Sequence, residues 1–241
     1  MRWERYHFEK EESIVTFLCK SQYVESGQKS LLNSRKILEN YIRENPEFAT
    51  THLSYHASKD APELIRLMCR EAEKVDVGPM AAVAGALAQE SLKAILDAGA
   101  EEAVVDNGGD IALFIREPVS IGIFAGDSPI NQVAFEVVPR NKPFGICTSS
   151  GTVGHSFSYG RADAAVVVSS NAILADAAAT ALGNRVKEEK DLDRCFTFLE
   201  NVPDIEGALV IYHDKIALWG ELPELVKSRV DVNLITKGGI V

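Results

Sequence analysis

The spacing of hydrophobic residues in the first hundred positions predicts a hairpin followed by helices. Residues 3–8 and 13–19 have the composition of two strands, and the charged segment 9–12 between them predicts a turn. From Ser26 onward, apolar side chains recur at helical spacing until Asn45-Pro46 stops the pattern. Two further helices are predicted, over residues 62–75 and 80–98.

Short strands dominate the remainder of the chain. They are predicted over residues 104–106, 111–115, 119–124, 133–138 and 164–168. A helix is expected from Ile173 to about Leu182, capped by Gly183-Asn184, and a charged helix from Lys187 to about Glu200. A last hairpin joins residues 208–212 to 216–219. This order favours an α+β fold, with mixed or antiparallel sheets flanked by helices, over a parallel doubly wound sheet.

Composition excludes several classes of protein. With 241 residues, 46% of them hydrophobic and 25% charged, the chain suits one globular domain over residues 1–241. The net charge of −10 argues against general binding of nucleic acid or of anionic membranes, which requires a basic face. The longest apolar run, Val77–Ala88, is shorter than the roughly 20 residues that a membrane-spanning helix needs.

Cysteine usage and the N-terminal segment predict a cytoplasmic protein. The four cysteines lie far apart without a Cys-x-x-Cys pair, so neither a disulfide framework nor a zinc knuckle fits their spacing. The first twelve residues are mostly charged or aromatic and contain no apolar stretch typical of a secretory signal. A homodimer is predicted from the apolar content alone.

Two glycine-bearing segments could contribute to a site. Gly78-Pro79 opens a predicted helix whose first turns hold small residues, and the free N–H groups of a helix start favour an anion such as phosphate. A tightly packed core helix explains the same residues. In the segment Asp106–Ile111, ordinary hairpin-turn chemistry explains Gly108 and Gly109. It explains Asp110 less well, because two flanking carboxylates in one tight turn invite either a cation or repulsion.

The segment Gly145–Asp163 is the strongest candidate for a binding loop. It holds seven hydroxyl side chains, four glycines, a histidine and an arginine, directly before a predicted buried strand. Hydroxyls, backbone N–H groups and one arginine can cradle a phosphate or a carboxylate. A serine-hydrolase triad is disfavoured, because no Gly-x-Ser-x-Gly elbow is present. The candidate ligand-binding residues here are Thr148, Ser149, Ser150, Gly151 and Arg161.

Asp176 and Thr180 predict a magnesium site. They stand at positions i and i+4 of a helix that is otherwise rich in alanine, and therefore share one face. An acidic group on an apolar helix is costly unless it is paired or binds a cation. A carboxylate and a hydroxyl are oxygen ligands that Mg²⁺ accepts, with waters and a phosphate completing the octahedron. Alternatively, Asp176 caps a neighbouring loop and Thr180 bonds back to its own helix.

Taken in order, these segments resemble the ApbE-like superfamily, whose best-known members are FAD:protein FMN transferases. The chain is most similar to a short branch found chiefly in archaea and anaerobic bacteria. The resemblance covers roughly residues 76–220 and implies an α+β fold of two interleaved halves, Mg²⁺ at the Asp/Thr pair, and a flavin ligand such as FAD or FMN. The matching motifs are Gly78–Gly85, Gly108–Asp110, Thr148–Gly151, and Asp176 with Thr180.

The chain departs from the family pattern at two places. The stretch Ala81–Gly85 lacks the lysine of the transferases, and Gly154–Arg161 replaces their histidine-containing loop. In that replacement, His155 takes the place of the family histidine as a candidate catalytic residue. The resemblance therefore implies the fold and the metal site more strongly than FMN transfer to a protein threonine.

Two other hypotheses stay open. Cys147, next to the hydroxyl-rich segment, could carry a persulfide or an acyl group, and the resemblance links the short branch with sulfur assimilation in anaerobes. Alternatively, the chain is a non-catalytic ligand-binding member of the fold, as the missing lysine would favour. Cys147 as a small buried hydrophobic residue is the simpler interpretation of that cysteine.

Overall fold

The computed structural model describes residues 3–10, 13–151 and 160–228. Its strands form two sheets, and every described pair of neighbouring strands is antiparallel. The larger sheet has eight strands in the order β1 (Glu4–Lys10), β2 (Ser13–Cys19), β3 (Ala103–Asn107), β4 (Asp110–Phe114), β7 (Phe144–Ser149), β8 (Ala164–Ser169), β9 (Ile205–Tyr212) and β10 (Lys215–Gly220). The smaller sheet has the order β11 (Glu224–Lys227), β6 (Val133–Val137) and β5 (Val119–Ile123).

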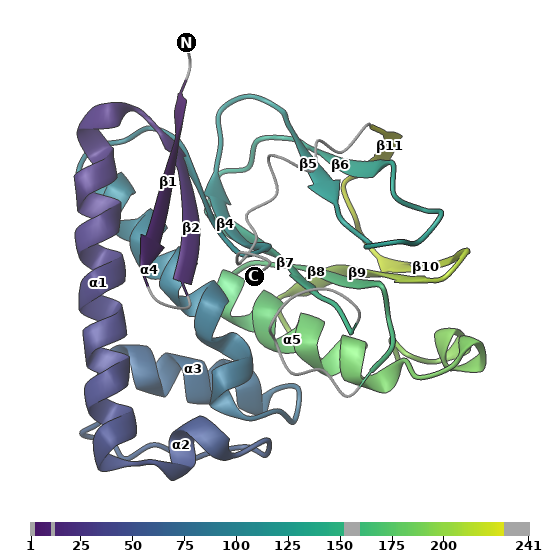
Figure 1. Cartoon of the computed structure of the whole chain (residues 1–241), viewed down its shortest axis with the longest axis horizontal. Coiled ribbons are helices and arrows are strands. Elements are labelled where there is room, and N and C mark those ends of the chain that lie inside the picture. Colours follow the sequence, from purple (N-terminus) through teal and green to yellow (C-terminus); the bar gives the residue numbers. More distant parts are fainter. Residues whose placement is uncertain (1–2, 11–12, 152–159, 229–241) are drawn as a thin grey trace.

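Helices cover one face of the large sheet, and the small sheet covers the other (Figure 1). The described helices are α1 (Ser21–Glu44), α2 (Glu47–Thr50), α3 (Glu63–Glu73), α4 (Val83–Asp97) and α5 (Ala172–Arg185), with the short 3₁₀ segments η1 (Pro79–Ala82) and η2 (Glu189–Asp193). None of these helices combines the length and the apolar character that crossing a membrane would require, as far as the described residues show.

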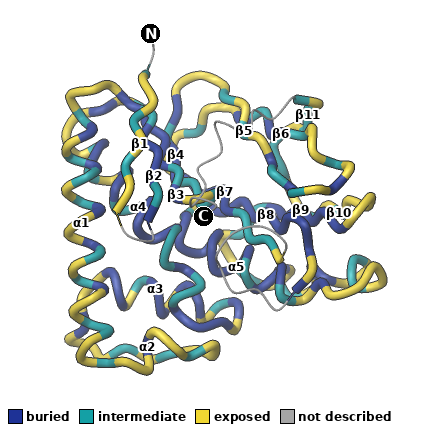
Figure 2. The backbone as a smooth tube through the Cα atoms, in the orientation of Figure 1, coloured by how far each residue is buried: buried dark blue, intermediate teal, exposed yellow. Residues whose placement is uncertain are grey.

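Two hydrophobic cores follow from the alternation of side chains along the strands. Val105 and Val167 face the helices, whereas their neighbours Val104 and Val166 face the small sheet, with Phe135 between the two sheets. All six residues of β8 are buried, because this strand is covered on both faces (Figure 2).

Helix α5 lies at the centre of the molecule. Its start is capped by Asn171, whose side-chain oxygen accepts a hydrogen bond from the Leu174 N–H at 2.8 Å. Alanines occupy nearly all its faces, so the helix is buried almost completely and packs closely on β7. A Cβ at Gly145 of β7 would collide with the backbone of Ala172, which explains why that strand position is a glycine.

The α+β fold, with antiparallel sheets flanked by helices, confirms the prediction from sequence. The prediction of a charged helix over residues 187–200 is wrong, because only Glu189–Asp193 form a short 3₁₀ turn there. The Asp191 carboxylate accepts hydrogen bonds from the backbone N–H groups of Lys187 and Glu188, so local side-chain bonding replaces helical bonding there.

Two further expectations near the site are corrected. The predicted loop Gly145–Asp163 begins as a central strand, since β7 extends to Ser149. Gly183-Asn184 does not cap α5, which continues to Arg185. A Cβ at position 183 would meet the Ser149 side chain only at ordinary van der Waals distances of 3.4 Å or more, so packing does not require this glycine.

Candidate functional site

A polar row crosses the helix-covered face of the large sheet. Asn107 of β3 is paired with Asp110 of β4, which in turn is paired with Cys147 of β7. Residues paired in this way project from the same face of a sheet. The row continues into Val15 on one side and Val167 on the other, so the three polar side chains interrupt an otherwise apolar line beneath the helices.

Gly108 and Gly109 form the turn that presents Asp110. Both have positive φ angles, 70° and 104°, as a two-residue type I′ turn requires. The Gly109 N–H donates to Oδ1 of Asp106 at 2.9 Å. Turn geometry therefore explains these two glycines, and direct contact with a ligand is not needed to account for them.

Asp176 reaches across from α5 to the start of α4. Its Oδ2 atom accepts a hydrogen bond from the Gly85 N–H at 2.8 Å, and the Ala84 N–H also bonds to this carboxylate. These amides belong to the first turn of α4 and have no partner within their own helix. The side chain thus caps a helix start, which is close to the capping alternative that the sequence left open.

Asn107 and Gly85 complete this arrangement; both lie within the candidate segments of the sequence analysis, but neither was named there as a site residue. The Asn107 amide donates to the Ala84 carbonyl oxygen at 3.1 Å, tying β3 to the start of α4. A Cβ at Gly85 would collide with the Ala172 carbonyl oxygen and lie 2.8 Å from Cβ of Asp176. The strand-pairing row was the available signal for Asn107, whereas nothing in the local sequence marks the contact of Gly85 with α5.

Burial disfavours the ionised form of both carboxylates, Asp176 and Asp110. It raises the pKa of Asp176 to about 7, although the two amide hydrogen bonds act in the opposite direction. Burial also raises the pKa of Asp110 well above its usual range, and the negative charges of Asp176 and Asp106 raise it further. The Oδ1 atom of Asp110 is buried without a hydrogen-bond partner.

Cys147 lies in the same cluster, in the environment of an inert thiol. It is fully buried, with its Sγ 3.4 Å from the Ala172 carbonyl oxygen. Burial, followed by the charges of Asp110 and Asp176, raises the pKa of this thiol well above its usual value. Reactive cysteines have the opposite surroundings, electropositive and partly exposed. All four cysteines of the chain are buried and free.

The hydroxyl-rich residues continue from this cluster toward the end of α5. Thr148 and Ser149 end strand β7, and the register places Ser149 on the same face as Cys147. Thr180 follows Asp176 by one turn and is partly exposed. The structure therefore brings Asp110 close to Asp176 and places the Ser149 side chain beside Gly183, near the end of α5.

The remaining candidates lie at or beyond this end of the sheet. Ser150 and Gly151 follow β7 directly, and the Gly151 N–H donates to the Ala162 carbonyl oxygen at 2.9 Å. The Arg161 side chain is exposed, while its backbone N–H donates to Val186 at 2.7 Å. His155 lies outside the described residues.

Gly78 is explained by packing. A Cβ there would collide with the Thr51 carbonyl oxygen, so the backbone before η1 lies directly against residues 51–52. The free amides of a helix start that the sequence suggested near Gly78 are instead those of Ala84 and Gly85, and a protein carboxylate already accepts from them.

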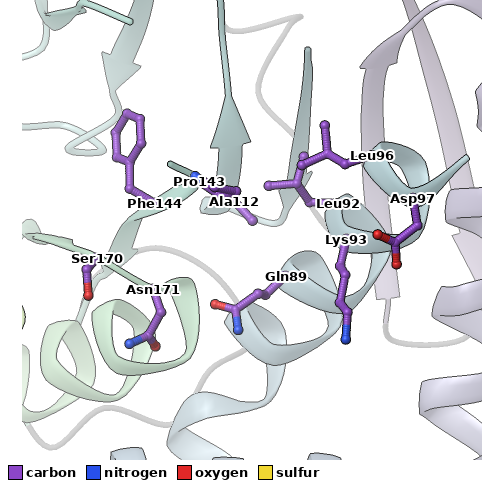
Figure 3. Close-up of a pocket in the computed structure, with 10 residues that line it drawn as sticks. All are labelled: Gln89, Leu92, Lys93, Leu96, Asp97, Ala112, Pro143, Phe144, Ser170 and Asn171. Carbon is purple, nitrogen blue, oxygen red and sulfur yellow. The ribbon is translucent and has the colours of Figure 1, made fainter. Parts of the chain in front are cut away.

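A pocket of about 390 Å³ opens at the other end of the same elements (Figure 3). Leu92 and Leu96 of α4 form one wall, and Phe144 at the beginning of β7 forms another. The Gln89 side chain points toward Asn171, and its Oε1 accepts a hydrogen bond from the Ala172 N–H at 2.9 Å. None of the site residues predicted from sequence lines this pocket.

The acidic cluster, formed by Asp110 and Asp176, offers oxygen atoms as ligands for a cation. Within the described ranges, no three side chains of His, Cys, Asp or Glu converge in a way that could hold a metal ion. A cation in the cluster would therefore depend on the two carboxylates, on hydroxyl or carbonyl oxygens, and on water. Mg²⁺ commonly accepts such a set, because it retains several waters.

Comparisons with known proteins support the family and the fold. A family model described as "AbpE bacteria" matches residues 3–204. A UPF0280 protein of Methanocella arvoryzae is 46% identical over 227 residues, covering 94% of this chain and 93% of the relative. A UPF0280 protein of Methanothrix thermoacetophila is 44% identical over 236 residues, covering 97% and 99%.

Solved structures with the same fold share little sequence with this chain. The ApbE protein of Thermotoga maritima matches with a TM-score of 0.61 at 11% identity, covering 98% of this chain and all of the other. The apo flavinyl transferase ApbE of Pseudomonas stutzeri matches with a TM-score of 0.60 at 12% identity, covering 98% of each chain. At such identities the likeness shows the fold alone.

Proposed function

The chain belongs to the family described as "AbpE bacteria", and on this premise we propose that it binds a flavin nucleotide, FAD or FMN, together with Mg²⁺ at Asp176 and Thr180. The observation that carries the proposal is the position of Asp176. Its carboxylate is anchored by the first turn of α4, beside the unpartnered oxygen of Asp110 and one helical turn from Thr180.

The donor set fits Mg²⁺. A carboxylate oxygen that no described protein group satisfies is a site where a hard cation lowers the cost of burial. When bound, Mg²⁺ neutralises the phosphates of a nucleotide. The hydroxyls of Ser149 and Ser150 and the exposed Arg161 supply donors at the same end of the sheet for the remaining phosphate oxygens.

A flavin-transferase type of activity is the fuller version of this proposal. Two solved structures with this fold, from Vibrio cholerae and Pseudomonas stutzeri, are named flavin or flavinyl transferases, and the match covers 91% and 98% of this chain. The stretch Ala81–Gly85 without lysine supports transfer less well than it supports binding. A non-catalytic flavin binder is therefore the second candidate.

Binding of metal and nucleotide should depend on one another. We expect Asp176→Asn to weaken Mg²⁺-dependent binding at least tenfold, roughly 1.4 kcal/mol, because the amide keeps the cap but removes the charge. Thr180→Val should show a smaller loss in the same direction. Calorimetric titration of FAD, FMN and ADP, with Mg²⁺ and with EDTA, measures both. Wild-type protein that binds a nucleotide equally well in EDTA would show that the metal assignment is wrong.

The thiol hypothesis predicts a reactive Cys147, whereas the buried position of this thiol predicts an unreactive one. Because the thiol is buried and its pKa is raised, we expect iodoacetamide at neutral pH to leave Cys147 unmodified in the folded protein. Peptide mass spectrometry after brief labelling measures this, with labelling in denaturant as the positive control. Rapid modification of Cys147 that a nucleotide prevents would favour the thiol enzyme instead.

A further inference from the structure

The two carboxylates of the site, of the buried Asp176 and the partly buried Asp110, come from opposite sides of one packing interface. Asp110 projects from the sheet toward α5, and Asp176 projects from α5 toward the start of α4. Cys147 connects the two locally, since its thiol bonds with Asp110 and its Sγ lies 3.4 Å from the Ala172 carbonyl oxygen, one turn before Asp176. The charge of Asp176 disfavours ionisation of Asp110, and the charges of both carboxylates disfavour ionisation of the Cys147 thiol.

Protein groups satisfy these carboxylates unequally. Asp176 accepts two amide hydrogen bonds, whereas Oδ1 of Asp110 is buried and has no partner. The charged groups that chiefly act on Asp110 are Asp176 and Asp106, and both are negative. Two buried like charges without a counter-charge are costly, and an oxygen-seeking cation between them removes that cost.

A third buried carboxylate shows what compensation looks like in this molecule. Glu71 is 2% exposed, and its two oxygens lie 2.7 Å from the cationic groups of Arg70 and Lys74. At Glu71 the chain thus supplies two positive side chains beside a buried carboxylate. The contrast points to a counter-ion from solution at Asp110.

We propose that Asp110 is a second protein ligand of the divalent cation, so that Asp110 and Asp176 hold the cation between them before any nucleotide binds. This inference rests on the cation site of the proposed function and adds an order of events to it. One carboxylate with waters would require a nucleotide phosphate for useful affinity, whereas two carboxylates bind a hard cation on their own. Prior occupation then raises nucleotide affinity, and the nucleotide raises cation affinity by the same factor.

The test is a titration of Mn²⁺ into the full-length protein with no nucleotide present. Free Mn²⁺ is measured by electron paramagnetic resonance, and Mg²⁺ is added as the competitor. We expect one Mn²⁺ per chain, displaced by Mg²⁺, with affinity reduced at least tenfold in both Asp110→Asn and Asp176→Asn. Glu71→Gln is the matched control, because it neutralises a buried carboxylate that already has protein cations, and it should retain the wild-type affinity.

Two outcomes would overturn the inference while leaving the proposed function intact. The first is wild-type protein that takes up no Mn²⁺ at millimolar concentration without nucleotide but binds a flavin nucleotide in a Mg²⁺-dependent way. The second is Asp110→Asn with wild-type Mn²⁺ affinity while Asp176→Asn has lost it. Failure of the proposed function looks different, since then no nucleotide binds under any condition.

Thermal unfolding of each variant separates loss of ligand from loss of fold. Without metal, Asp110→Asn should melt at or above the wild-type temperature, because the substitution removes a buried like charge. Mg²⁺ should raise the melting temperature of wild type but not that of Asp110→Asn. If Asp110→Asn does not fold, Asp110→Ser takes its place. A folded Ser variant that Mg²⁺ stabilises as much as it stabilises wild type would also overturn the inference.

Discussion

Helices α4 and α5 cap each other, but they do so with side chains of different charge. At the pocket end, the start of α5 is served by two neutral amides, Asn171 of its own N-cap and Gln89 from α4. At the acidic end, the start of α4 is served by the carboxylate of Asp176 from α5. Both arrangements satisfy the free N–H groups of a helix start.

The difference shows that capping alone does not require a buried acid here. A neutral amide performs the same task one turn away along both helices, without a second carboxylate beside it. A carboxylate at a helix start gains from the helix dipole, but that gain is typically below about 1 kcal/mol and does not account for Asp110. The acidic end therefore has the features of a site, and the pocket end those of a structural joint.

The largest expected effect comes from filling the close contact between the start of α4 and the start of α5. Gly85→Ala should destabilise the protein by about 3 kcal/mol, because the new Cβ meets the Ala172 carbonyl oxygen, part of the backbone. The free energy of unfolding in urea measures the loss. Gly183→Ala on the same helix pair is the control. Its Cβ would have only ordinary contacts beyond 3.4 Å, so helix propensity should leave stability unchanged or slightly raised. Equal losses in both variants would contradict this account.

The next largest effect is expected in the pH dependence of stability, because the start of α4 is capped by a group that titrates and the start of α5 is not. Burial raises the pKa of Asp176 from 3.8 to about 7, so the folded protein holds this proton more tightly than the unfolded chain does. Its contribution to stability is complete below pH 3.8 and is lost as the pH rises through about 7, and Asp110 acts in the same direction.

Unfolding measured in EDTA between pH 4 and 8 tests this statement. Wild-type stability should fall with rising pH across that range, and Asp176→Asn should flatten the curve, because the amide caps α4 without titrating. Saturating Mg²⁺ should also reduce the fall, since the cation replaces the proton. Superimposable curves for wild type and Asp176→Asn in EDTA would contradict the assigned environment of this carboxylate.

Sequence reasoning was sufficient where the determinants are local. Asn107-Gly108-Gly109-Asp110 predicts a tight turn from the backbone preferences of its own residues, and the structure has that turn. Asp176 was recognisable as a candidate because a charged residue on an alanine-rich helix needs a partner. Both observations concern single segments.

The remainder depends on contacts between segments distant in the chain. Strand β7 was read as a loop, because glycine, serine and threonine are typical of turns, yet Gly145 is needed for the close approach of α5. The partner of Asp176, Gly85, lies 91 residues away, and no periodicity predicts such a pair. The charged segment after Lys187 carries Leu192, Cys195, Phe196 and Leu199 at helical spacing, and the core takes up these side chains without a regular helix. Local side-chain bonds to the backbone at Lys187 and Glu188 decided the shape of its beginning.

The smallest effect on stability is expected at the pocket end, where the neutral side chain of Gln89 caps the start of α5. Gln89→Leu keeps the approximate volume but removes the acceptor of the Ala172 N–H, so stability should fall by about 1 kcal/mol. Mn²⁺ and nucleotide affinities should remain at the wild-type values, because the acidic end of α4 is untouched.

Gln89→Glu sharpens the test, since it places at the start of α5 the same charge that Asp176 brings to the start of α4. This variant should recover the lost stability without creating a second Mn²⁺ site. The other carboxylate that lines the pocket, Asp97, lies two turns further along α4, and the sheet contributes only Ala112 and Phe144 there. Urea unfolding and Mn²⁺ titration of the two variants measure both properties. A second bound Mn²⁺ in Gln89→Glu would mean that one carboxylate at a helix start is enough to bind the cation. Asp110 would then not explain why the two ends differ.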